Sequence, residues 1–258
     1  MKKVLLALLV SLVIASSAFA GTKITVGVTP FPHKDIMLVV KDLLQKDGYD
    51  LVIKEFTDYV TPNMALAEKS LDANFFQHIP YLENMNKERK LNLVNVAKVH
   101  IEPIGLYSQK IKKLDDLKKR AQIAIPNDPT NCARALKLLE KAGLIKVKEG
   151  ELVTAKDITE NPKKLRFREL DAAQLPRTLQ DVDASVINTN FAVEAKLIPA
   201  KDEIIIEGKE SPYANIVVVR EADKESPATK ALVKAVNSPE VKKYINDVLV
   251  PRGIVPAF

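Results

Sequence analysis

The chain has 258 residues, of which 47% are hydrophobic and 28% charged, and its formal net charge is +6. This length suits one large domain or two of ordinary size, and the hydrophobic fraction is ample for a real core. Basic residues are dispersed among acidic ones, as in residues 112–116, whereas a nucleic-acid binder concentrates them on one face or in one run. We therefore expect a solvated surface and no nucleic-acid partner.

The N-terminal segment has the parts of a cleavable secretory signal. Two lysines precede an apolar run at 4–14, and small residues end at Ala20. The apolar run is shorter than the roughly 20 residues that span a bilayer. Gly21 occupies the position at which a lipoprotein carries its lipid-accepting cysteine. We therefore expect cleavage of residues 1–20, a freely diffusing periplasmic protein that is not a lipoprotein, and no membrane span after cleavage.

The first half of the mature chain alternates strands and helices. The hydrophobic pattern predicts strands at 23–28 and 51–56, a loop at 29–33 and a helix at 35–46. A short helix is then expected, with Thr61 as its N-cap and Pro62 at its first position. This order predicts parallel βαβ units with right-handed crossovers.

A similar order restarts near residue 121. The expected elements are strands at 121–125, 165–170, 184–187 and 216–220, helices at 132–141 and 172–179, and two amphipathic helices within 227–250. The polar turn 126–131 precedes the helix at 132–141. Two α/β lobes are the simplest interpretation of this pattern.

Signatures of catalysis are scarce. The chain has no G-x-S-x-G, H-E-x-x-H or glycine-rich phosphate loop, and its three histidines, at positions 33, 78 and 100, are isolated in sequence. Those histidines could form a metal site only if the fold brought them together, and we expect neither a metal nor a cofactor. The single cysteine, Cys132, is better explained as a small packed residue than as a reactive thiol. An enzyme using Cys132 or His78 is an alternative that no motif favours.

Two segments could form a ligand site. Residues 72–82 gather two phenylalanines, a histidine and a tyrosine in a chain that is only 5% aromatic, and Tyr59 lies just upstream. Such residues can form a pocket wall, although their spacing alone favours a packed core. The helix that follows Asn131 could bind an anion at its N-terminus with the help of Arg134. Equally, Asp128, Thr130 or Asn131 could simply cap that helix.

Seven blocks of sequence together resemble one known family, the NlpA-type methionine-binding proteins of ABC importers. The blocks keep their order from about residue 24 to the C-terminus, and an ordered set is far more specific than any one member. They read DYVTPNMAL, DANFFQHIPYL, IEPIGLYSQKIKKLDDL, IAIPNDPTNCARALKLLEKAGLI, ENPKKLRFRELDAAQLPRTL, VINTNFA and ESPYANIVV.

This resemblance implies an α/β fold with two lobes, the periplasmic-binding-protein fold, with a ligand cleft between the lobes and two hinge crossovers. By analogy the crossovers fall near 105–108 and near 211–215. The first lobe would comprise residues 22–106 together with 211–258, and the second lobe residues 107–210.

The resemblance also implies a site for methionine. The family's aromatic ligand cage falls on Tyr59, Phe76, His78 and Tyr81, its carboxylate-binding arginine on Arg134 beside Asn131, and its two asparagines for the polar end of the ligand on Asn188 and Asn215. The implied partners are methionine, an ABC permease and its ATPase subunits, and we expect a monomer. Alternative ligands are another apolar amino acid or a small methionine-containing peptide. A coexisting surface adhesin role would leave no trace in the sequence.

Overall fold

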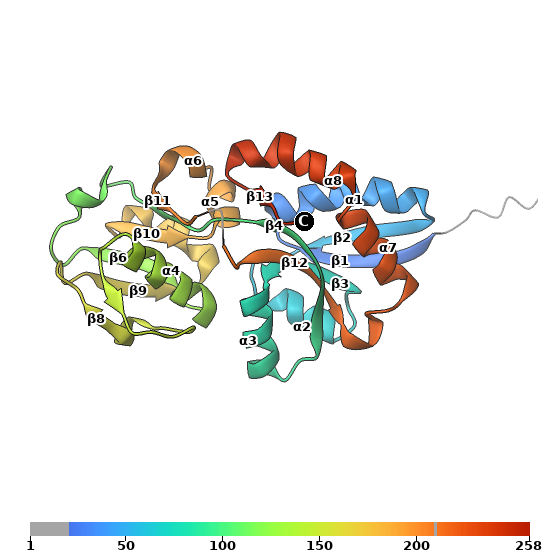
Figure 1. Cartoon of the computed structure of the whole chain (residues 1–258), viewed down its shortest axis with the longest axis horizontal. Coiled ribbons are helices and arrows are strands. Elements are labelled where there is room, and N and C mark those ends of the chain that lie inside the picture. The colour runs from blue at the N-terminus through green and yellow to red at the C-terminus, as the bar shows by residue number, and fades with distance from the viewer. Residues whose placement is uncertain (1–20, 209–210) are drawn as a thin grey trace, which may run out of the picture.

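The computed structural model describes residues 21–208 and 211–258. The predicted signal peptide, residues 1–20, lies outside the described residues. Two α/β units lie beside each other along the long axis of the molecule, each built on its own sheet (Figure 1). The α/β class and the two-lobed arrangement agree with the sequence prediction.

The first sheet has six strands in the order β13-β4-β12-β3-β1-β2. Its strands are β1 (Thr22–Val28), β2 (Tyr49–Glu55), β3 (Ala73–His78), β4 (Leu93–Ile101), β12 (Ala214–Arg220) and β13 (Val255–Pro256). β1 pairs in parallel with β2 and β3, as predicted, but β12 is inserted antiparallel between β3 and β4. This late strand returns from the other lobe, so it enters the sheet in the opposite direction.

Helices cover both faces of the first sheet (Figure 1). They are α1 (Asp35–Lys46), α2 (Thr61–Ala67), α3 (Ile79–Arg89), α7 (Pro227–Val236) and α8 (Pro239–Tyr244). On α1, the positions Ile36, Met37, Val40 and Leu44 recur at helical spacing and are all buried. They pack with strand residues such as Val26 in one continuous core.

The second sheet has five strands in the order β11-β5-β10-β6-β9. They are β5 (Gly105–Tyr107), β6 (Gln122–Pro126), β9 (Arg166–Leu170), β10 (Ala184–Ile187) and β11 (Glu203–Ile206), and a separate pair is formed by β7 (Lys146–Val147) and β8 (Ile158–Glu160). The helices of this lobe are α4 (Pro129–Lys141), α5 (Thr189–Glu194), α6 (Pro199–Asp202) and a 3-10 helix at Ala172–Gln180. The apolar side of α4 packs on β6 and β10 in a second core.

The chain passes between the sheets twice, after β4 and after β11 (Figure 1). These crossings lie beside each other, because the Glu207 backbone N–H donates to the Ile104 carbonyl over 2.9 Å. β5 starts at Gly105 and already pairs with β10 of the second sheet. The strand pairing therefore places the first crossover at residues 102–104, just before the predicted hinge at 105–108. The predicted lobe boundaries remain a prediction.

One predicted cap is wrong. Thr61 begins α2 but its side chain caps nothing, because the preceding turn is closed by Asp58, whose Oδ1 accepts from the backbone N–H groups of Val60 and Thr61, each over 2.7 Å. Asp58 lies far enough upstream to bond both amides, which a threonine inside the helix cannot do.

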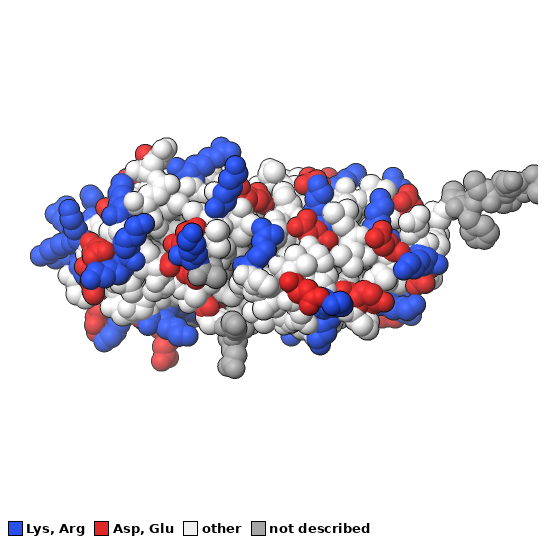
Figure 2. All heavy atoms as spheres, turned by 90° about the horizontal axis from the view of Figure 1, so that it is seen from above, with Lys and Arg blue, Asp and Glu red and all other residues white. Residues whose placement is uncertain are grey.

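The exposed charges of both signs are interspersed over the face shown in Figure 2, as their dispersal in the sequence predicts. Among residues 21–208 and 211–258, no helix combines the length and the apolar character that crossing a membrane requires.

Candidate ligand-binding cleft

A pocket lies between the two lobes, and all eight predicted ligand residues line it. They are Tyr59, Phe76, His78, Tyr81, Asn131, Arg134, Asn188 and Asn215. The fold therefore gathers side chains spread over more than half of the sequence. Their role in binding a ligand stays a prediction, since the pocket shows their position and not their occupant.

The aromatic wall, defined as Tyr59, Phe76, His78 and Tyr81, belongs to the first lobe. Phe76 and His78 close the fully buried strand β3, and Tyr81 follows in the first turn of α3. The ring centroids of Phe76 and Tyr81 are 6.0 Å apart and those of Tyr59 and Phe76 are 5.9 Å apart. Tyr81 Oη donates to the Tyr59 carbonyl over 2.8 Å. These contacts within the protein hold the rings against one another without the help of a ligand.

The neighbouring phenylalanine serves a different purpose. Phe75 packs in the main core of the first lobe, whereas Phe76 belongs to a small cluster with Tyr81 and Met85 beside the cleft. Successive strand residues point to opposite faces, so one aromatic pair supplies both core and pocket. The core and pocket interpretations of this segment are therefore both correct.

His78 has a defined tautomer. Its Nδ1 accepts from the backbone N–H of Tyr81 over 3.2 Å and so caps α3, which leaves Nε2 to carry the hydrogen. Nε2 then donates to Asn131 Oδ1 across the cleft over 3.2 Å. Burial, followed by the charge of Arg134, lowers the pKa of His78 to about 3, so the ring is neutral at physiological pH.

The polar wall, defined as Asn131, Arg134, Asn188 and Asn190, belongs to the second lobe. Asp128 caps α4 and accepts both the Asn131 backbone N–H and its side-chain amide. This carboxylate occupies the helix N-terminus that the sequence offered as an anion site. The Asn131 oxygen meanwhile accepts from His78 and from Asn188 Nδ2, the latter over 3.1 Å. Asn131 therefore joins the two walls, and both the oxygen and the nitrogen of its side-chain amide already have hydrogen-bond partners within the protein.

Arg134 lies in the second turn of α4, because the helix begins at Pro129. Its Nε donates to Glu207 Oε1 over 3.0 Å, and its Nη2 bonds both Glu207 and the Glu102 carbonyl, the latter over 2.8 Å. The Tyr213 ring covers the guanidinium, with 4.3 Å between Cζ and the ring centroid. The arginine thus contacts both crossings. Among the described residues Nη1 has no hydrogen-bond partner, and this edge of the fork remains for a ligand.

Two polar atoms of the polar wall are buried without a partner among the described residues. Asn188 Oδ1 is an acceptor and Asn190 Nδ2 is a donor, and both residues line the pocket. Tyr59 Oη donates to the oxygen of the same Asn190 over 2.6 Å and so joins the walls at a second point. A buried orphan acceptor beside an orphan donor indicates a ligand that carries both kinds of group.

The sequence interpretation missed several residues that line the pocket or support it. They are Gln77, Glu102, Thr189, Asn190 and Glu207. Asn190 could have been found from the run Asn188-Thr189-Asn190, which follows a buried strand. Glu102 follows an apolar strand directly, whereas no local signal marks Glu207.

Cys132 is buried in the core of the second lobe. Burial, reinforced by Glu169 and Asp128, raises the pKa of its thiol to about 12. The raised pKa disfavours the reactive thiolate at neutral pH, and the buried position agrees with the packed residue expected from the sequence.

The fold and the cleft define a two-lobed substrate-binding protein of the periplasmic class, and the comparisons agree. A structure from Burkholderia cenocepacia, described as a nutrient binding protein bound to methionine, superposes with a TM-score of 0.88 at 48% identity and covers 91% of this chain and 100% of its own. A periplasmic substrate-binding protein of an ABC transporter from Coxiella burnetii gives 0.86 at 48% identity, with coverage of 91% and 100%.

The sequence narrows the class to one family. A D-methionine-binding lipoprotein MetQ from Salmonella typhi is 45% identical over 252 residues, which is 93% of each chain. The profile of the NlpA lipoprotein family matches residues 24–258. The chain belongs to the NlpA lipoprotein family, and the resemblance drawn from the seven blocks is confirmed.

The same findings correct the predicted localisation. The chain was expected not to be a lipoprotein, yet its family and its Salmonella relative are both named lipoproteins. The prediction depended on one position, Gly21 after Ala20. Similarity over almost the whole chain outweighs that single residue.

Proposed function

We propose that this protein is the methionine-binding component of an ABC importer and delivers methionine to the permease and its ATPase subunits. The observation that carries the proposal is the pairing of an aromatic wall with a polar wall that keeps an unpartnered acceptor and an unpartnered donor. Its relatives are substrate-binding proteins, and one is bound to methionine. The protein acts by binding and not by catalysis, as a monomer, and its first 20 residues direct its export.

The ligand's polar end faces the second lobe in this proposal. Arg134 Nη1 and Asn190 Nδ2 donate to the carboxylate, and the oxygens of Asn188 and Asn215 accept from the ammonium. Charge-assisted hydrogen bonds of this kind contribute about 1.5–3 kcal/mol each. The polar wall therefore sets the affinity for amino acids in general.

The ligand's side chain faces the first lobe. The thioether lies among Tyr59, Phe76 and Tyr81, where each sulfur–aromatic contact contributes about 0.3–1.5 kcal/mol. These contacts select methionine among apolar amino acids. The two hydrogen bonds between the walls, from Tyr59 to Asn190 and from His78 to Asn131, close the pocket around a single amino acid more readily than around a peptide.

Closure is the proposed mechanism. Residues 22–106 with 211–258 form one lobe, residues 107–210 form the other, and the crossings between them act as a hinge. Ligand binding holds the lobes together, because the ligand contacts both walls.

Mass spectrometry of the ligand that co-purifies with the protein from cells tests the proposal. Methionine is the expected ligand. Recovery of a different apolar amino acid, or of a methionine-containing peptide, would show that this compound and not methionine is the ligand. The protein would still be a substrate-binding protein.

A further inference from the structure

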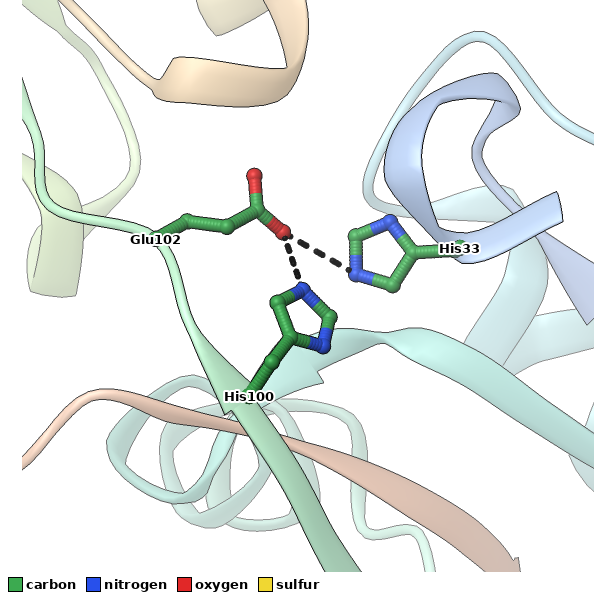
Figure 3. A group of neighbouring side chains, drawn as sticks. All are labelled: His33, His100 and Glu102. Atoms are coloured by element: carbon green, nitrogen blue, oxygen red, sulfur yellow. Dashed lines mark hydrogen bonds and ion pairs between the residues drawn. The ribbon is translucent and has the colours of Figure 1, made fainter. Parts of the chain in front are cut away.

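Glu102 is a buried carboxylate in the first crossing, directly after β4, and it lines the cleft. Two imidazoles converge on one of its oxygens, as Figure 3 shows. His100 Nε2 lies 2.8 Å from Glu102 Oε1, and His33 Nε2 lies 3.3 Å from the same atom. The second oxygen points away from both rings (Figure 3). The three residues come from the turn before α1, the end of β4 and the crossing.

Both imidazoles are neutral. His100 Nε2 donates to Glu102 Oε1, whereas the hydrogen bond of His33 Nε2 is with Asn215 Oδ1, over 3.1 Å, and its contact with Glu102 Oε1 is a close polar approach. Burial lowers the pKa of His33 to about 4 and that of His100 to about 3. His33 Nδ1 lies 2.7 Å from Thr29 Oγ1, whose hydroxyl can donate to it, and His33 Nε2 faces only oxygen acceptors, those of Asn215 and Glu102. The hydrogen of each ring is therefore assigned to Nε2. Donation orients the carboxylate but supplies no positive charge.

The nearest cation does not neutralise Glu102 either. Arg134 donates to the backbone carbonyl of Glu102, and its charge is already paired with Glu207. Burial raises the pKa of Glu102, although His33, Arg134 and the Asn190 backbone amide act in the opposite direction. A buried carboxylate without its own cation is costly, so a cation supplied by the ligand would be strongly favoured there.

We propose that Glu102 binds the α-ammonium of the ligand, with His33 and His100 as positioning residues that aim its carboxylate into the cleft. The inference rests on the proposed function and deepens it, since that proposal assigned the ammonium to asparagine oxygens alone. Asn188 Oδ1, the unpartnered acceptor of the polar wall, supplies a second contact to the same ammonium. The site therefore recognises a zwitterion by two opposite charges, and it discriminates against keto acids and N-acylated amino acids.

A metal ion is the competing occupant of this cluster. The donor atoms of His33, His100 and Glu102 lie within 4.8 Å of one another. Zinc bonds of about 2.0–2.1 Å place tetrahedral ligand atoms roughly 3.3 Å apart. The 2.8 Å between His100 Nε2 and Glu102 Oε1 is shorter than that and is an ordinary hydrogen-bond distance. An ammonium in the cleft requires no such rearrangement.

The test is calorimetry on ligand-stripped protein with methionine and with its deaminated analogue, γ-methylsulfanylbutyrate. Glu102→Gln should weaken methionine binding about 10- to 100-fold, because a charge-assisted contact is lost. Binding of the deaminated analogue should stay within about twofold or become tighter, since the neutral amide no longer needs a cation. His100→Gln should change the ratio of the two affinities in the same direction by a few-fold. Glu203→Gln, a carboxylate outside this pocket whose pKa burial also raises, is the matched control and should leave both affinities unchanged.

Three outcomes would overturn the inference and leave the proposed function intact. Equal weakening of both ligands by Glu102→Gln would mean that Glu102 only supports the fold of the crossing, and an unchanged affinity for methionine would mean that the ammonium is held elsewhere. Tight binding of Zn²⁺ alone, abolished in both Glu102→Gln and His100→Gln while the ratio of the two ligand affinities stays constant, would assign the cluster to a metal. Absence of methionine binding by the unsubstituted protein would instead overturn the proposed function and this inference together.

Discussion

The two walls of the cleft differ in how complete they are. The rings of the aromatic wall pack on one another and on Met85, and His78 is bonded at both nitrogens. In the polar wall, the oxygen of Asn188 and the nitrogen of Asn190 have no partner among the described residues. The contacts of the aromatic wall are therefore complete in the fold itself, whereas the polar wall keeps hydrogen-bonding groups that a ligand could pair with. Under the proposed function, this difference predicts that affinity for the ligand resides mainly in the second lobe and selectivity in the first.

Removing the charge of the polar wall should have the largest effect. Arg134→Ala is expected to weaken methionine binding at least tenfold, because the ligand carboxylate loses its charge-assisted contact with Arg134 Nη1 in a buried site. Isothermal titration of ligand-stripped protein measures this change. Arg166→Ala, at an exposed arginine of the same lobe, is the control and should have no effect. An Arg134 variant that binds as tightly as the unsubstituted protein would show that the carboxylate is held elsewhere.

Thinning the aromatic wall should have a smaller and more selective effect. Phe76→Leu is expected to weaken methionine binding about 2- to 10-fold, which is the range of one sulfur–aromatic contact. Alanine lacks the thioether, so its weaker binding should change less. Competition titrations with both amino acids measure the ratio, and Phe167→Leu in β9, outside the pocket, serves as control. A parallel loss for both amino acids would contradict the division between affinity and selectivity.

Breaking a hydrogen bond between the walls should change affinity by a similar or smaller factor. Tyr59→Phe removes the hydroxyl that donates to Asn190 over 2.6 Å and leaves the ring in place. We expect methionine binding to weaken by a few-fold, since a neutral hydrogen bond contributes about 0.5–1.5 kcal/mol. Solution scattering should show a smaller difference in radius of gyration between free and bound forms if closure itself is impaired. Full closure together with unchanged affinity would mean that this bond does not hold the lobes.

The three histidines link stability to pH in one direction. His33, His78 and His100 are neutral in the folded state, with pKa values lowered to about 4, 3 and 3. In the unfolded chain a histidine binds a proton below about pH 6.5. The unfolded state thus binds more protons between these values, so the free energy of unfolding falls as the pH falls from about 6.5 towards 4.

A histidine variant isolates this contribution. His33→Gln should lower the proton uptake on unfolding near pH 5.5 by about one proton. The slope of unfolding free energy against pH measures the uptake. Asp128, whose pKa is raised by burial and not influenced by His33, acts in the opposite direction and is unchanged in the variant. Glu102 contacts His33, which lowers the pKa of that carboxyl, so the variant raises this pKa further and reduces the slope in the same sense. An identical slope in the variant and the parent would mean that His33 is charged in the folded state.

Much of the fold was predictable because local patterns decide it. The helix at 35–46 and the strand at 184–187 match the observed α1 and β10 residue for residue, since each has a clear period and defined ends. The strand β3 was not foreseen as a strand, because its run of aromatic and polar residues is buried on both faces and shows no alternation. The antiparallel entry of β12 is set by the path of the chain through the other lobe, which no local pattern records.

The site divides in the same way. The aromatic wall comes from one short segment and Tyr59, so it could be located from the sequence. The pairing of Arg134 with Glu207 joins residues 73 positions apart, and the cluster around Glu102 joins the turn after β1 to the end of β4. Such contacts exist only once both crossings are in place. Resemblance to a family predicted the ligand residues. Which groups in the cleft are charged, protonated or already paired could be determined only from the three-dimensional structure.

Titration of ligand-stripped protein with L- and D-methionine and a panel of apolar amino acids tests the central claim most directly. The two-wall account predicts saturable binding at one site per chain, with at least one methionine enantiomer bound more tightly than leucine, isoleucine or phenylalanine. Tight binding of another apolar amino acid without measurable binding of either methionine enantiomer would contradict it.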